Sequence, residues 1–195
     1  MKGKLTLLLG GVRSGKSRTA EKMANSLGER VLYVATAEAK DEEMRARIEA
    51  HRSTRPVSWR TLEARSDIGS AVQTALAKET ADVVLLDCFT MLVSNVLLQG
   101  IPDGEPDRID ATAARDRVAA ELDAVVAALD AHSVPWIIVS NEVGWGVVPP
   151  SPLGRIYRDL LGWANQRLAE VANAVYLMVA GLPLNITRLG SGEED

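Results

Sequence analysis

Short apolar runs and longer amphipathic segments alternate along the chain. The apolar runs contain few polar residues, which is typical of strands that are covered on both faces. We predict strands at residues 5–9, 31–35, 57–62, 83–86, 136–139 and 175–179. Segments with a helical spacing of apolar residues fill the gaps, and we predict helices at residues 16–27, 41–52, 66–78, 108–131 and 153–171. This alternation predicts an α/β fold with a mostly parallel sheet flanked by helices.

Two connecting segments rich in Gly and Pro interrupt this pattern. Residues 99–107 are expected to form a loop, and residues 141–151 follow directly after a predicted strand. In open α/β sheets, ligands bind at the carboxyl ends of the strands. We therefore expect residues 141–151 to border a ligand site. The last residues, 190–195, are expected to form a frayed tail.

The composition narrows the class of protein. With 195 residues, of which 47% are hydrophobic, the chain is long enough for one domain, residues 1–195, with a full core. A net charge of -4 argues against nucleic-acid binding over a broad face. No apolar run approaches the ~18 residues that a membrane span needs. One Cys and two His are too few ligands for a structural zinc site, so any metal is expected to be held by oxygen. The apolar stretch at residues 5–9 is too short for a signal peptide, so we expect a cytoplasmic protein.

A phosphate-binding loop motif follows the first predicted strand. The pattern G-x-x-x-x-G-K-[ST] is matched by Gly10-Gly11-Val12-Arg13-Ser14-Gly15-Lys16-Ser17. The two motif glycines allow a tight turn whose N–H groups point into one concavity, and the following helix adds its positive N-terminal end. We expect Lys16 to reach the β- and γ-phosphates of a nucleotide and the Ser17 hydroxyl to ligate Mg²⁺.

A carboxylate at the end of another apolar strand completes this type of site. Residues 83–86 form an apolar run that ends in Asp87. This is the Walker B form, and it predicts that Asp87 lies beside the phosphate loop and contributes to a metal site. An aspartate that only caps the following helix is the alternative interpretation. Cys88 is most simply a small buried residue.

The setting of one histidine points to further chemistry. On the predicted helix 41–52, Arg47 and His51 are i and i+4 neighbours, and Arg52 and Arg55 follow closely. Nearby cations keep an imidazole neutral at pH 7, and a neutral imidazole is a nucleophile. The same arginines are suited to holding a phosphate chain. A solvated basic helix face with an incidental histidine is the alternative interpretation.

Six blocks of residues match a known family in order along the chain. They are the phosphate loop, Tyr33-Val34-Ala35-Thr36-Ala37, His51-Arg52-Ser53-Thr54-Arg55-Pro56 with Trp59 and Glu63, Leu86-Asp87-Cys88 with Ser94-Asn95, Ser140-Asn141-Glu142-Val143-Gly144, and Ala180-Gly181-Leu182-Pro183-Leu184. With these blocks the chain resembles the bifunctional adenosylcobinamide kinase / adenosylcobinamide-phosphate guanylyltransferase family of cobalamin biosynthesis. The arginine inside the phosphate loop and the H-R-x-x-R-P block make the resemblance specific.

The resemblance implies roles for individual positions. His51 falls on the family's guanylylated histidine, which with Lys16 and Asp87 makes up the expected catalytic set. The nucleotide-binding positions it implies are Gly10 to Ser17, Val34, Ala35, Thr36, Arg52, Ser53, Thr54, Arg55, Glu63 and Asp87. It further implies a RecA-like P-loop fold and a homotrimer. Phe89 and Leu92 depart from the family pattern, and Trp145 stands in an unusual loop, either as a corrinoid contact or as a packed side chain.

Two reactions are implied for the family. The first phosphorylates adenosylcobinamide with ATP or GTP and Mg²⁺, and the second transfers GMP from GTP through a guanylyl-histidine. The resemblance leaves the preference for ATP or GTP in the first reaction open. Two other functions fit the same motifs: a small-molecule P-loop kinase without a covalent step, and a GTP-dependent switch protein.

Overall fold

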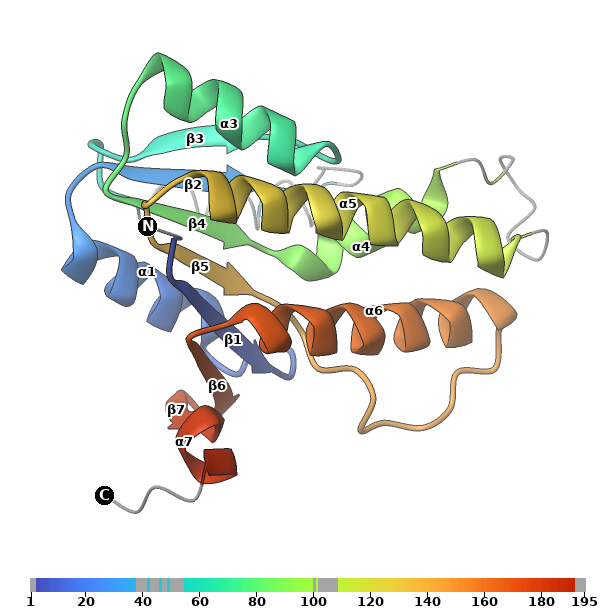
Figure 1. The fold of residues 1–195 in the computed structure, drawn as a ribbon. Helices are drawn as coiled ribbons and strands as arrows, with labels where there is room; N and C mark the ends of the chain where they lie inside the picture. Colours follow the sequence, from blue (N-terminus) through green and yellow to red (C-terminus); the bar gives the residue numbers. More distant parts are fainter. Residues whose placement is uncertain are drawn as a thin grey trace.

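Seven strands form one sheet in the computed structural model, which describes residues 3–37, 42, 46, 49, 55–99, 101 and 109–191. The strands are β1 (Leu5–Gly10), β2 (Val31–Ala35), β3 (Arg60–Glu63), β4 (Val83–Asp87), β5 (Trp136–Val139), β6 (Ala174–Val179) and β7 (Leu182–Asn185). The order across the sheet is β3-β2-β4-β5-β1-β6-β7. All neighbours run parallel except β6 and β7, which form an antiparallel pair. The carboxyl ends of the parallel strands therefore meet at one edge (Figure 1).

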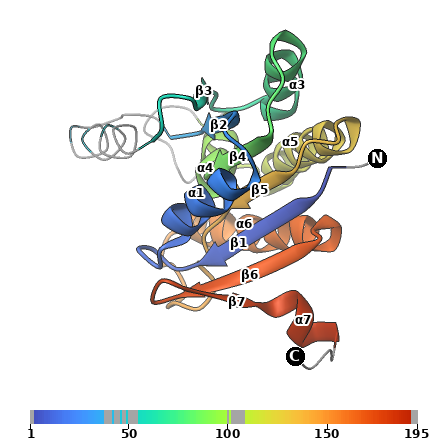
Figure 2. The ribbon, with the colours of Figure 1, turned by 90° about the vertical axis from the view of Figure 1, so that its left-hand side faces the viewer.

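Helices cover both faces of the sheet. They are α1 (Lys16–Leu27), α3 (Ile68–Lys78), α4 (Phe89–Leu98), α5 (Ala111–Ala131), α6 (Pro152–Val171) and α7 (Ile186–Ser191). Figure 2 shows α1 on one face and α3 and α5 on the other. The buried apolar side chains form two clusters accordingly, a larger one beneath α3, α4, α5 and α6 and a smaller one beneath α1. The predicted α/β P-loop class, with a mostly parallel sheet flanked by helices, is confirmed.

Several predicted boundaries were wrong for local reasons. The strand predicted at residues 57–62 is Arg60–Glu63, because Trp59 N donates to Pro56 O in a turn that leaves Val57 fully exposed. Helix α5 begins three residues later than predicted, where the Asp110 side chain accepts hydrogen bonds from the first turn. The predicted helix 41–52 and loop 99–107 lie mostly outside the described residues.

Three elements were not predicted at all. Helix α4 is mostly apolar and buries even two of its polar residues, Thr90 and Asn95, so it lacks the amphipathic period that marks a surface helix. Strand β7 is short and contains Pro183, which is tolerated here because β7 is the last strand of the sheet. Helix α7 is capped by the Asn185 side chain, which accepts from Thr187 N and Arg188 N, and it includes residues 190 and 191 of the predicted frayed tail.

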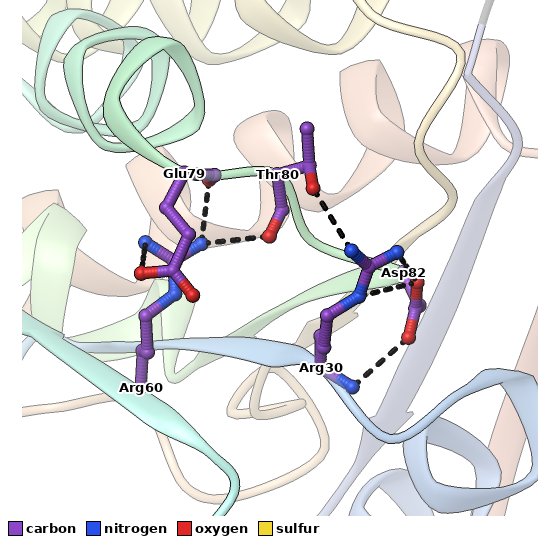
Figure 3. Close-up of polar contacts among 5 residues, drawn as sticks. All are labelled: Arg30, Arg60, Glu79, Thr80 and Asp82. Atoms are coloured by element: carbon purple, nitrogen blue, oxygen red, sulfur yellow. Dashed lines mark hydrogen bonds and ion pairs between the residues drawn. The ribbon is translucent and has the colours of Figure 1, made fainter.

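A polar cluster joins the amino-terminal ends of β2, β3 and β4, and Figure 3 shows its side chains. Arg30 donates to Asp82 and to Thr80 Oγ1, and Arg60 donates to the backbone oxygens of Glu79 and Thr80. The hydrogen bond from Arg30 lowers the pKa of Asp82 to about 2. Arg30 and Glu79 are exposed and Arg60 and Asp82 are half-buried, and ion pairs at such a surface contribute little to stability individually. The cluster has a structural role at the edge that faces away from the site.

Candidate functional site

The loop between β1 and α1 has the backbone of a phosphate cradle. Gly10 has φ 153° and Gly15 has φ 92°, values that side-chain-bearing residues rarely adopt. A Cβ at Gly10 would lie 2.7 Å from Met178 O, so only glycine fits. Arg13 has φ 58°, a conformation that costs energy outside glycine and is concentrated at functional sites. The loop holds a strained, concave conformation that its own sequence makes possible.

Lys16 is buried and folded back onto this loop. Its Nζ donates to Gly10 O at 2.8 Å and to Gly11 O at 2.6 Å. Burial lowers the pKa of Lys16 from its ordinary value, while the negative charge of Asp87 acts in the opposite direction. Ser17, the next residue, is half-buried in the first turn of α1. The ammonium group therefore lies within the loop, where a bound phosphate would compete for it.

Two segments distant in sequence donate backbone hydrogen bonds to carbonyl oxygens of the phosphate loop. Gly181 N, in the turn between β6 and β7, donates to Ser14 O at 2.9 Å, and Glu142 N donates to Gly10 O at 3.0 Å. Neither contact was predicted, because both join residues more than 130 positions apart. The only sequence signal was that both segments belong to blocks shared with a family. They act on the site through the loop backbone.

Asp87 lies at the carboxyl end of β4, on the same edge as the phosphate loop. In the sheet register Ala35 is paired with Asp87 on one side and with Glu63 on the other. Asp87 is half-buried, and its Oδ2 accepts a hydrogen bond from Tyr33 Oη at 3.1 Å. Three predicted site positions thus share one level of the sheet, although Glu63 is exposed.

The residues around Asp87 are locked by side-chain hydrogen bonds. Thr36 is fully buried, and its Oγ1 donates to Cys88 O at 2.7 Å and accepts from Cys88 N at 3.1 Å. Burial raises the pKa of the Cys88 thiol to about 11, so the thiol is neutral at pH 7. Cys88 is half-buried against the smaller apolar cluster, and not fully buried as predicted. Val34 is a core residue of the larger apolar cluster.

Arg55 is the described member of the predicted histidine and arginine block. Its guanidinium carbon lies 3.4 Å from the centroid of the Tyr33 ring. Its Nε is buried and has no hydrogen-bond acceptor among the described residues. His51, Arg52, Ser53 and Thr54 lie outside the described residues. A half-buried cation with a buried Nε–H that no described residue accepts from is suited to an anionic ligand.

A buried polar network that the sequence did not reveal fixes the start of the loop after β5. Asn165 on α6 accepts from Ser140 Oγ at 2.7 Å and donates to Asn141 O at 3.0 Å. Thr90 Oγ1 accepts from Asn141 N at 2.6 Å. Further along this loop Trp145 is 77% exposed, so the interpretation that it is a packed side chain was wrong.

Comparisons with known proteins agree with this geometry. A family model described as cobinamide kinase / cobinamide phosphate guanyltransferase matches residues 6–186. The chain belongs to this family. Among its relatives, the bifunctional adenosylcobalamin biosynthesis protein CobU of Escherichia coli is 41% identical over 93% of this chain and 99% of its own length. The protein of the same name from Salmonella typhimurium is 38% identical over the same shares.

A third relative extends the family membership to another genus. The bifunctional adenosylcobalamin biosynthesis protein CobP of Pseudomonas aeruginosa is 42% identical over 91% of this chain and 94% of its own length. The phosphate loop, Asp87 and the turn at Gly181 all fall within the residues that the cobinamide kinase / cobinamide phosphate guanyltransferase model matches. Within the described part of the chain, no helix is suited to crossing a membrane.

Proposed function

We propose that this chain catalyses two successive reactions on adenosylcobinamide. It first phosphorylates the hydroxyl of the aminopropanol arm with ATP or GTP. It then transfers GMP from GTP to the new phosphate, which yields adenosylcobinamide-GDP and pyrophosphate. The observation that carries the proposal is the meeting of the phosphate loop, Lys16 and Asp87 at one sheet edge in a chain of the cobinamide kinase / cobinamide phosphate guanyltransferase family.

For the first reaction, this chain supplies charge and position. The N–H groups of the loop and the Lys16 ammonium are suited to binding the β- and γ-phosphates, in place of the loop carbonyls that Lys16 now contacts. This arrangement stabilises the negative charge that develops while the acceptor hydroxyl attacks the γ-phosphorus.

The residues present fit a magnesium ion that arrives with the nucleotide. Mg²⁺ usually keeps several waters and takes one or two protein oxygens in addition to phosphate oxygens. Asp87 and Ser17 offer one carboxylate and one hydroxyl, and the described residues contain no cluster of three or more metal-binding side chains. Once bound, the ion would neutralise phosphate charge.

For the second reaction, we propose that His51 is the nucleophile. Its neutral imidazole nitrogen forms a bond to the α-phosphorus of GTP while the bond to the β-phosphate oxygen breaks and pyrophosphate leaves. A phosphate oxygen of the corrinoid then displaces the histidine nitrogen, so the GMP group moves to the acceptor. Arg52 and Arg55 stabilise charge at the α-phosphorus. Arg55 and Asp87 both contact Tyr33, Arg55 through the ring and Asp87 through the hydroxyl, and this shared neighbour supports the step.

Product analysis tests the proposed function. The protein is incubated with adenosylcobinamide, Mg²⁺ and either ATP or GTP, and the corrinoids are separated by chromatography. We expect the phosphate with both nucleotides or one of them, and the GDP derivative with pyrophosphate only when GTP is present. A kinase without a covalent step would stop at the phosphate, and a switch protein would hydrolyse or bind GTP without altering the corrinoid.

The resemblance also supports a proposed assembly and location. We propose a homotrimer in the cytosol. Exposed apolar side chains on β7 and near it, Leu182 at 72% and Leu184 at 48%, are compatible with a surface that another copy covers. Light scattering after size-exclusion chromatography should give three times the 21.0 kDa chain mass, and a monomer mass would contradict the proposed assembly.

A further inference from the structure

Tyr33 lies between two groups that the proposed reactions use. It is a residue of β2 paired with Leu85 of β4, and it is 3% exposed in the core cluster beneath α1. Side chains alternate along a strand, so Asp87, two positions after Leu85, faces the same side of the sheet as Tyr33. The register therefore brings the phenol of Tyr33 to the Asp87 carboxylate across neighbouring strands.

The hydroxyl of Tyr33 donates a hydrogen bond to Asp87 Oδ2 at 3.1 Å. The phenol is the donor in this contact, because a carboxylate oxygen only accepts. A purely apolar core would accept Phe at this position at lower desolvation cost. We therefore assign the hydroxyl the role of orienting the Asp87 carboxylate.

The ring of Tyr33 has a second contact. The Arg55 guanidinium carbon lies 3.4 Å from the ring centroid, and the Trp59 ring stacks on Tyr33 with centroids 6.3 Å apart and planes 26° apart. The cation–π contact holds the guanidinium against the ring face and does not itself occupy an N–H donor. Arg55 Nε consequently keeps its hydrogen-bonding capacity, since no described residue accepts from it.

We propose that Tyr33 is a positioning residue that sets the Asp87 carboxylate and the Arg55 guanidinium relative to each other at the nucleotide site. The proposal rests on the function proposed above and adds a residue to its machinery. Its hydroxyl orients Asp87, which is proposed to bind the metal ion. Its ring positions Arg55, which is proposed to stabilise charge at the α-phosphate. The two actions are separable by substitution, because Tyr33→Phe removes only the first and Tyr33→Leu removes both.

Calorimetric titration of GTP into the whole protein measures the two actions separately. Each variant is titrated once with Mg²⁺ and once with EDTA. For Tyr33→Phe, we expect the enhancement of GTP affinity by Mg²⁺ to fall by about tenfold or more, because hydrogen bonds to metal-ligating carboxylates have effects of this size. The affinity in EDTA should stay unchanged. Tyr176→Phe removes the phenol hydroxyl of a half-buried residue packed against the same core cluster and should behave as wild type in both titrations.

The ring is tested in the EDTA titration alone. Tyr33→Leu should lose a further factor of roughly 2 to 30 in GTP affinity, the range of a cation–π contact. Arg55→Ala should lose at least as much, because it also removes the guanidinium that is proposed to bind phosphate. The double variant should lose no more than Arg55→Ala alone, because Tyr33 acts on this half of the site only through Arg55. Thermal unfolding of each variant reports whether the chain is folded, and if Tyr33→Leu does not fold, the Tyr33→Phe result decides the proposal.

The outcomes separate this proposal from the function on which it rests. Equal enhancement by Mg²⁺ in Tyr33→Phe and wild type would overturn the positioning role while the two-reaction function stands. An equal loss in the Mg²⁺ and EDTA titrations of Tyr33→Phe would also overturn it, because this is the pattern of a general packing defect. Wild-type protein that binds no GTP under either condition would overturn the proposed function itself.

Discussion

Replacing Lys16 by Met should slow catalysis strongly while leaving the fold almost as stable as before. Methionine keeps the apolar stem of the side chain and removes the ammonium group. The two carbonyls that Lys16 contacts do not lose all their partners, since Gly10 O still accepts from Glu142 N at 3.0 Å and Gly11 O still accepts from Ser14 N at 3.3 Å. The substitution therefore leaves no buried loop carbonyl without a donor.

The expected magnitudes follow from these contacts. Hydrogen bonds from a charged donor contribute about 1.5–3 kcal/mol each, but the lowered pKa of Lys16 shows that its burial already costs part of this. We expect the free energy of unfolding to fall by less than about 2 kcal/mol. Phosphoryl transfer loses an interaction that stabilises transition-state charge, and removal of one such group costs about 100- to 1,000-fold in rate.

Urea unfolding and corrinoid phosphorylation measured on the same preparations test this reasoning. Lys22→Met is the matched control, because Lys22 is exposed on the same helix and should leave both quantities unchanged. The reasoning is wrong if Lys16→Met is unfolded, or if it phosphorylates the corrinoid within about tenfold of wild type. It is equally wrong if the guanylyl transfer keeps its full rate, because both reactions are expected to use the same nucleotide region.

Further predictions concern packing and charge. Gly69→Ala should lower the free energy of unfolding by about 1–3 kcal/mol, because its Cβ would lie 2.3 Å from Ala124 O on α5. At Gly162, within α6, an added Cβ would meet nothing within 4 Å, so Gly162→Ala should instead raise the free energy of unfolding by up to about 1 kcal/mol through helix propensity. Equal effects of the two substitutions in urea unfolding would contradict the close contact between Gly69 and Ala124. Asp82→Asn should lower the melting temperature at pH 7. Because the pKa of Asp82 is lowered to about 2 in the folded protein from about 4 when unfolded, its stabilisation is present above pH ~4 and disappears as the pH falls toward 2. Melting curves whose separation stays constant between pH 5 and pH ~2 would show that Asp82 has no such role.

The sequence predicted correctly those features that depend on residues close together in the chain. The phosphate loop is a contiguous motif, and its glycines adopt the backbone conformations that the motif requires. Asp87 ends an apolar run, and such runs are visible without any knowledge of the strand order. The α/β class followed from the same alternation of apolar runs and amphipathic segments.

The remainder depended on contacts between distant segments. The hydrogen bond from Tyr33 to Asp87 follows from the register of β2 on β4, which no local pattern specifies. The support of Ser14 by Gly181 requires the turn after β6 to lie beside β1. Helix α4 was missed because its burial removes the polar face on which sequence periodicity depends.

The most direct test of the account is covalent labelling by GTP. The protein is incubated with Mg²⁺ and GTP labelled at the α-phosphate, denatured, and examined for label that acid releases and alkali does not. The account predicts such label in wild type, its loss in His51→Ala, and its retention in His132→Ala, which replaces the chain's only other histidine. Label that survives His51→Ala, or wild-type protein that never takes up label while it converts the corrinoid, would contradict the account.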